Sequence, residues 1–136
     1  MNLMYGSIQD FNRQVIKMIP RRLIEIVTQN NIIYTVVANM ENDEVESIGE
    51  ISELEYSPIA KNLFGDKQSI ENLFISLKGQ MLPRTWRQGR VSAVVCNPSK
   101  DIVVGLFYHE NADDPIAKYR YAKNLNMMIE DIWRDK

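Results

Sequence analysis

Two runs rich in β-branched and aromatic residues, 91–96 and 102–108, stand only five residues apart, and this closeness most constrains the fold. Parallel strands need a crossover of a dozen or more residues, whereas antiparallel strands can be joined by a short turn. The intervening residues, 97–101, begin Asn-Pro-Ser, which is typical turn chemistry. The sequence therefore predicts an antiparallel hairpin in the second half of the chain.

A second hairpin is predicted in the first half. Residues 32–38 form an apolar strand signal, and residues 45–51 alternate between apolar and polar positions. Polar residues 39–44 separate the two runs as a turn. Residues 84–90 could be either a loop or a polar strand. We therefore expect one mainly antiparallel sheet of four to five strands.

Three amphipathic helical segments accompany these strands. The first spans residues 7–29, where Pro20 predicts a kink or a division into two helices. The second begins at Ser57-Pro58 and runs to Leu77, with a possible split at Gly65-Asp66. The third begins at Asp114-Pro115. The predicted class is α+β, with the order αββαβ(β)βα and the helices packed on the sheet.

Two sets of apolar residues are expected to be buried. Alternation along the strands places one set on inward faces: Val36, Val94, Cys96, Val104 and Leu106. Helical periodicity predicts that the helices bury the other: Leu23, Ile26, Phe74, Leu77, Ile129 and Trp133.

Length and charge narrow the class of protein. With 136 residues and a net charge of −2, we expect a single domain, 1–136, with no general attraction to nucleic acid or anionic lipid. Residues 1–20 are interpreted as an N-terminal helical extension or as the first part of the kinked helix. The N-terminus lacks a basic stretch before an apolar one, and no apolar run is long enough to span a membrane. The expected location is cytoplasmic, without a membrane partner.

Residues capable of catalysis are sparse and isolated. The only histidine, His109, follows a strand, and the only cysteine, Cys96, lies inside one. The six glycines match no phosphate-binding loop, and the acidic residues between 41 and 55 lack the spacing of a calcium site. We therefore predict a protein that is not an enzyme and has no catalytic residues, no cofactor and no metal.

One cluster suggests a binding surface: Arg84, Trp86, Arg87 and Arg90. Guanidinium groups around an indole could bind phosphate, a single-stranded base or an acidic protein surface. A structural alternative is a tryptophan packed at the core edge with arginines extending into solvent. The net charge disfavours nucleic acid, so this cluster is the candidate partner surface.

The order of elements leads to a family resemblance. The chain resembles the roadblock/LC7 family over residues 21–133. The resemblance lies in residues 22–27, 33–38 and 45–49, the pair Ile59-Ala60, and the late strands 92–96 and 101–108. Longin and profilin-like domains share much of this layout. The hairpin turn here lacks the Asp-Gly common in the family, and the helices are less rich in alanine. The resemblance implies a non-enzymatic dimeric scaffold that binds small Ras-like GTPases or motor and signalling complexes.

The middle helical segment also predicts a homodimer. It has more apolar residues than one buried face requires, which makes Ile70, Leu73, Phe74 and Leu77 the candidate dimer interface. In the competing interpretation, Gly65 breaks the helix and both pieces bury their apolar residues within one chain. Two alternative functions remain: a small-molecule-sensing domain with a pocket between helix and sheet, and a nucleotide or nucleic-acid binder through residues 84–90.

Overall fold

The computed structural model describes residues 19–111 and 113–134. Its elements, in chain order, are α2 (Arg21–Gln29), β1 (Tyr34–Asn39), β2 (Glu44–Gly49), the 3-10 helix η1 (Ile51–Glu53), α3 (Pro58–Phe64), α4 (Lys67–Ser76), β3 (Arg84–Gln88), β4 (Val91–Ser99), β5 (Ile102–His109) and α5 (Pro115–Arg134). The predicted α+β class is confirmed, and the predicted order αββαβ(β)βα is found with the optional strand present and the middle helix divided in two.

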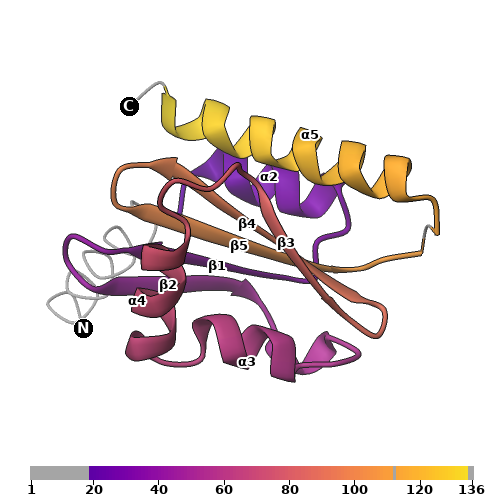
Figure 1. Ribbon diagram of the computed structural model, residues 1–136, viewed down its shortest axis with the longest axis horizontal. Helices are drawn as coiled ribbons and strands as arrows, with labels where there is room; N and C mark the ends of the chain where they lie inside the picture. Colours follow the sequence, from indigo (N-terminus) through magenta and orange to yellow (C-terminus); the bar gives the residue numbers. More distant parts are fainter. Residues whose placement is uncertain (1–18, 112, 135–136) are drawn as a thin grey trace, which may run out of the picture.

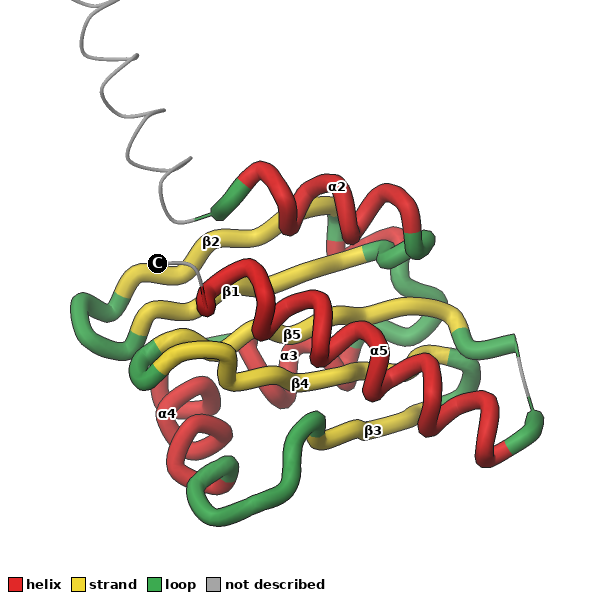
Figure 2. The backbone as a smooth tube through the Cα atoms, turned by 90° about the horizontal axis from the view of Figure 1, so that it is seen from above, coloured by secondary structure: helices red, strands yellow, loops and turns green. Residues whose placement is uncertain are grey.

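The five strands form one sheet in the order β2-β1-β5-β4-β3, and every neighbouring pair is antiparallel. Both predicted hairpins are present, as β1–β2 and β4–β5. The ambiguous segment 84–90 contains a strand, β3, which pairs only with β4. Within residues 19–111 and 113–134 the sheet therefore has two free edges, β2 and β3, on opposite sides (Figure 2).

Helices cover both faces of the sheet. In Figure 1, α2 and α5 lie above it and α3 and α4 lie below. Each layer has its own apolar cluster, and adjacent residues of a strand belong to opposite clusters: Val37 packs with α2 and α5, whereas Val36 packs with α3 and α4. The five strand residues expected to be buried are all buried, but Val36 lies on the other face from Val94, Cys96, Val104 and Leu106.

The helical segment predicted before Pro20 lies outside the described residues, as does most of the predicted extension 1–20. Pro20 has an extended backbone and stands at the N-cap of α2, which begins at the next residue. On α2, Leu23 and Ile26 are buried as expected. On the other helices, Leu77 and Ile129 are buried, whereas Phe74 and Trp133 are partly buried against the two clusters.

The middle helical segment is two helices rather than one. The first helix, α3, ends before Gly65-Asp66, and α4 begins after them. The Asp66 carboxylate accepts a hydrogen bond from the Ser69 N–H at 2.7 Å and caps α4. The new direction of α4 lets Ile70 pack on the same apolar cluster as Phe64 of α3. The described residues therefore form four α-helices where three were expected.

Gly105 sets how closely α3 approaches the sheet. A Cβ atom at this position of β5 would lie 2.3 Å from Cε2 of Phe64, far inside van der Waals contact. The Phe64 ring therefore occupies the space that a side chain would need, and it also packs edge-on against Phe107 at 6.0 Å between ring centroids.

This contact predicts a specific coupling between two positions. We expect Gly105→Ala to lower the free energy of unfolding by about 1–3 kcal/mol, the usual cost of overpacking a core. In a Phe64→Leu background the same change should cost much less, because the shorter side chain leaves room for the methyl group. Urea unfolding of the two single variants and the double variant measures the coupling, and strictly additive costs would contradict it.

Candidate functional site

The β3–β4 hairpin contains all four residues of the candidate partner surface, but their side chains do not point to the same face of the sheet. Arg84 and Trp86 point to the face covered by α3 and α4, where the Arg84 guanidinium carbon lies 5.1 Å from the Trp86 ring centroid. Arg87 points to the opposite face, and Arg90 lies in the turn. The four residues are neighbours in sequence without forming one continuous surface.

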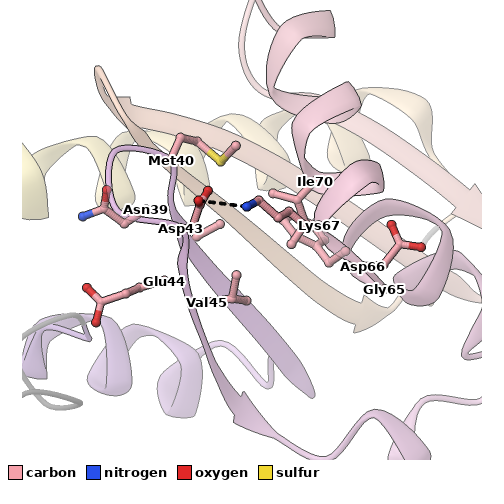
Figure 3. Close-up of a pocket in the computed structure, with 11 residues that line it drawn as sticks. Asn39, Met40, Asp43, Glu44, Val45, Gly65, Asp66, Lys67 and Ile70 are labelled. Carbon is pink, nitrogen blue, oxygen red and sulfur yellow. Dashed lines mark ion pairs between the residues drawn. The ribbon is translucent and has the colours of Figure 1, made fainter.

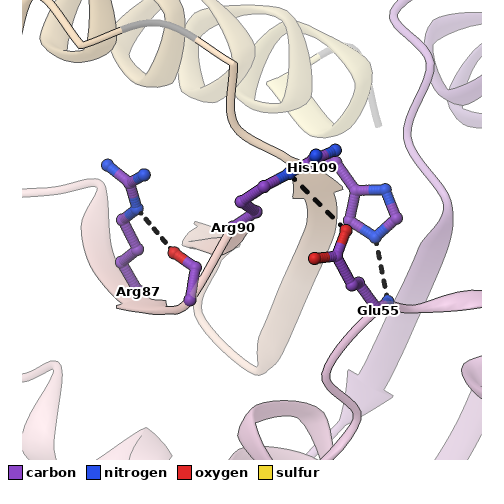
Figure 4. A network of polar contacts seen from close by, with 5 residues as sticks. Glu55, Arg87, Arg90 and His109 are labelled. Carbon is purple, nitrogen blue, oxygen red and sulfur yellow. Dashed lines mark hydrogen bonds and ion pairs between the residues drawn. The ribbon is translucent and has the colours of Figure 1, made fainter.

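Arg90 is held by a polar network at the end of the sheet (Figure 4). Its Nε lies 3.5 Å from the Glu55 carboxylate, and the backbone N–H of Glu55 donates to Nε2 of His109 at 2.9 Å. The network ties the loop before α3 to the ends of β4 and β5. The lone histidine therefore accepts a structural hydrogen bond, and its ring must be unprotonated at Nε2 to do so.

Arg87 is differently placed. Its Nε donates to the Gly89 carbonyl at 3.0 Å, which holds the side chain along the hairpin (Figure 4). Its terminal nitrogens make no hydrogen bond or ion pair within residues 19–111 and 113–134. Arg87 therefore offers an oriented guanidinium fork to an external group.

A groove lies between β3 and the first turns of α5. Its volume is about 580 Å³, and Arg87 lines it together with Leu82, Ser92, Tyr108, Lys118 and Tyr119. The pairing register places Ser92 of β4 opposite both Arg87 of β3 and Tyr108 of β5. Sequence analysis missed Ser92, Tyr108, Lys118 and Tyr119, because no local motif shows which residues of separate strands share a row.

Tyr108, which lines this groove, packs against Tyr121 of α5, which does not line it, and the two hydroxyls have different environments. The Tyr121 hydroxyl donates to the Asn30 carbonyl at 2.8 Å, which links α5 to the end of α2. The rings of Tyr108 and Tyr121 pack edge-on, with centroids 5.0 Å apart. Burial, followed by the nearby Glu110 carboxylate, raises the pKa of Tyr108 above its usual value. Tyr108 therefore keeps its proton at neutral pH and can donate a hydrogen bond.

Cys96 and His109 do not form a catalytic pair. His109 is opposite Val91 in the register, five residues along β4 from Cys96, a separation of about 17 Å. Complete burial raises the pKa of the Cys96 thiol, so it stays protonated among apolar neighbours. Cys96 is part of the core.

A smaller cavity of about 220 Å³ lies between the β1–β2 turn and the junction of α3 and α4 (Figure 3). The Lys67 ammonium lies 2.9 Å from the Asp43 carboxylate, and Asp66 is engaged as the cap of α4. The Glu44 side chain points away from these groups (Figure 3). Since these polar groups already have partners, the cavity offers less to a ligand than the groove beside β3.

The candidate dimer residues lie largely inside the chain. Ile70, Leu73 and Leu77 are 4%, 5% and 3% exposed and pack with the sheet, as the competing interpretation of a helix broken at Gly65 requires. Phe74 remains partly exposed. Any interface on this side must therefore use Phe74 and its exposed neighbours, such as Ile75, rather than the buried three.

The part of the chain that the structure describes has neither a membrane-spanning helix nor a metal-binding cluster. No helix in that part of the chain is long and apolar enough to cross a membrane. No group of three or more His, Cys, Asp or Glu side chains there is placed to hold a metal ion.

Comparison with known proteins finds similarity among solved structures only. No family model and no curated protein matches the sequence. Myxococcus xanthus MglB is 10% identical over 90% of this chain and 97% of its own, with a TM-score of 0.48. MglC from Myxococcus xanthus is 19% identical over 70% of this chain and 80% of its own, with a TM-score of 0.44. The present structure is an α+β domain with one antiparallel five-stranded sheet.

The capping of α4 predicts a pH-dependent contribution to stability. The Ser69 backbone hydrogen bond, followed by that of its side chain, lowers the pKa of Asp66 below its ordinary value of 3.8. A lowered pKa means that the stabilisation is complete above the unfolded-state pKa and is lost as the pH falls through the folded-state pKa. Asn caps helices as well as Asp but does not titrate.

We therefore expect the difference in melting temperature, wild type minus Asp66→Asn, to be constant above about pH 5. As the pH is lowered from about 5, this difference should decrease. Circular dichroism melts of both proteins between neutral and strongly acidic pH measure this difference. The other carboxylates titrate in both proteins and cancel. A difference that stays flat, or that grows in acid, would contradict the assignment.

Proposed function

We propose that this chain is a non-enzymatic protein-interaction module that forms a homodimer through the free edge of β3. The observation that carries the proposal is an edge strand whose outer backbone groups have no strand partner in the described structure. Unpaired edges of this kind favour pairing with another strand unless charges or bulges block it. The roadblock resemblance, which implies dimers that join sheets or helices across a two-fold axis, supports the same conclusion.

The two sheet edges differ in charge. The β1–β2 hairpin has Glu41, Asp43, Glu44 and Glu46, so two copies of the β2 edge would bring like charges together. The β3 strand, Arg84–Gln88, has two arginines separated by Thr85 and Trp86. Pairing through β3 is therefore electrostatically easier, provided that the register keeps the arginines apart.

A two-fold axis at Trp86 provides such a register. In an antiparallel pair centred on this residue, Trp86 faces its own copy, Arg84 faces Gln88, and Thr85 faces Arg87. Aromatic cross-strand pairs stabilise sheets, and no arginine is opposite another. Close by, Met81 is 87% exposed, and we expect a second copy to cover it.

The register can be tested with charge changes at Thr85, which is exposed and faces Arg87 of the second copy. Thr85→Lys should weaken the dimer and Thr85→Glu should strengthen it. Two cross-strand pairs at about 0.2–1 kcal/mol each correspond to a change of about two- to thirtyfold in Kd for each variant. Sedimentation velocity measures Kd, and light scattering should give twice the 15.8 kDa chain mass for the wild type.

The matched control is Ser47→Lys, an exposed position on the opposite edge strand β2. It makes the same gain of charge and should leave the dimer unchanged. A wild type that is monomeric at micromolar concentration would overturn the homodimer. A dimer that responds to Ser47→Lys and not to the Thr85 variants would place the interface on the other edge.

The finer part of the proposal concerns the partner. The roadblock resemblance implies a small Ras-like GTPase, so the module would regulate such a GTPase or a signalling complex that contains it. We expect purified Ras-like GTPases of the source organism to bind with different affinity in their GDP and GTP-analogue states. Calorimetry with both nucleotide states measures this, and equal or absent binding for all of them would remove the GTPase from the proposal.

A further inference from the structure

One row of side chains crosses the floor of the groove between β3 and α5. Arg87, Ser92 and Tyr108 belong to three neighbouring strands and are aligned by the pairing register. Adjacent strands lie about 4.8 Å apart, so the three polar groups are within reach of one small ligand. Alternation along each strand turns all three to the face covered by α5.

The two hydroxyl-bearing residues in this row are almost wholly buried, and their hydroxyl groups have no hydrogen-bond partner within residues 19–111 and 113–134. Ser92 is 7% exposed and Tyr108 is 6% exposed, and both line the groove. Neither side chain makes a hydrogen bond to any residue in the described part of the chain. Among the residues that the structure describes, the fully buried side-chain atoms without a partner are Thr35 Oγ1 and Asn126 Oδ1, so the Ser92 and Tyr108 oxygens, which are not among them, are open to the groove. Both hydroxyls are therefore free to hydrogen-bond a group that enters the groove.

The charges around the row favour an anion. Arg87 and the partly buried Lys118 line the groove, and neither forms an ion pair within the described residues. The N-terminal end of α5 is already capped, because the Ile116 N–H donates to the Asp114 carboxylate at 3.0 Å, so the positive charge comes from Arg87 and Lys118. Glu110 also lines the groove, and its charge helps to keep Tyr108 protonated as a donor.

The remaining walls are apolar. Leu82, Pro83 and Ala122 line the groove, together with the exposed ring of Tyr119. A volume of about 580 Å³ lies within the range of small-molecule sites, which combine apolar walls with a few convergent polar groups. An inorganic anion alone would leave these apolar walls in contact with water.

We propose that this groove binds a small organic acid, a carboxylate attached to an apolar or aromatic body. The Arg87 fork and the hydroxyls of Ser92 and Tyr108 bind the carboxylate, Lys118 lies above it, and Tyr119 and Leu82 contact the body. The site goes beyond the proposed dimer, because only Arg87 of these residues belongs to the β3 edge. It makes the module responsive to a metabolite as well as to a protein.

The test is a nuclear magnetic resonance titration of the full chain with four acids: benzoate, phenylacetate, 3-phenylpropionate and octanoate. We expect at least one acid to shift the amide resonances of residues 85–87, 92 and 118–122. The neutral amide of the same compound should bind about tenfold more weakly or worse, since it loses the charge-assisted hydrogen bonds. Inorganic phosphate should bind more weakly than the acid, because it has no apolar body.

Matched variants locate the contacts. Arg87→Gln should weaken binding of the acid by about tenfold or more, whereas Arg90→Gln, an arginine of the same hairpin outside the groove, should not. Ser92→Ala and Tyr108→Phe should each weaken binding several-fold. Neither Ser92 nor Tyr108 lies on the β3 edge, so weaker binding of the acid by these variants cannot be explained by a weaker dimer.

Three outcomes would overturn the site: no acid shifts the groove resonances, the amide binds as well as the acid, or the Arg87 and Arg90 variants behave alike. Light scattering on each variant separates this result from the proposed function. An intact dimer that binds no acid removes the ligand site alone, whereas acid binding by a monomer removes only the dimer.

Discussion

Burial of the sheet on both faces is the constraint on which the rest of the structure depends. β5 pairs with β1 on one side and β4 on the other, and its side chains alternate between two apolar clusters. Val104 and Leu106 contact the layer of α2 and α5, whereas Val103 and Phe107 contact α3 and α4. Because both helical layers pack on the same central strands, a change in the sheet is transmitted to each of them.

The fold could largely be predicted from local signals. The β-branched runs and the polar residues 97–101 between them predict the central hairpin, although β4 extends to Ser99, and Ser57-Pro58 marks the start of α3. The two-sided burial was harder to foresee, because a continuous apolar run does not reveal which cluster each residue joins. The residues Gly65-Asp66 predicted a possible break in the helix. The direction of α4 after the break depends on packing against the sheet, and this packing buries Ile70 and Leu73 in the chain's own core.

The candidate site was only partly accessible from the sequence. The arginines and the tryptophan of β3 form a visible cluster, but the period of two along a strand divides them between two faces. Ser92 and Tyr108 are sixteen residues apart and have no motif in common; only the antiparallel register brings them into one row with Arg87. Sites of this type arise from pairing geometry, which residue spacing along one chain does not encode.

The position of β3 has a consequence for dynamics. Among the described residues it is bonded to the sheet on one side only, and Thr85, Arg87 and Gln88 are exposed, so little apolar burial opposes its detachment. Segments with these properties open at a lower free energy than the rest of a domain, which exposes their amide hydrogens to exchange. A partner at the outer edge of β3, or a ligand in the groove behind it, would raise the free energy of this local opening. Binding would then slow amide exchange in β3 and leave exchange in the central hairpin unchanged.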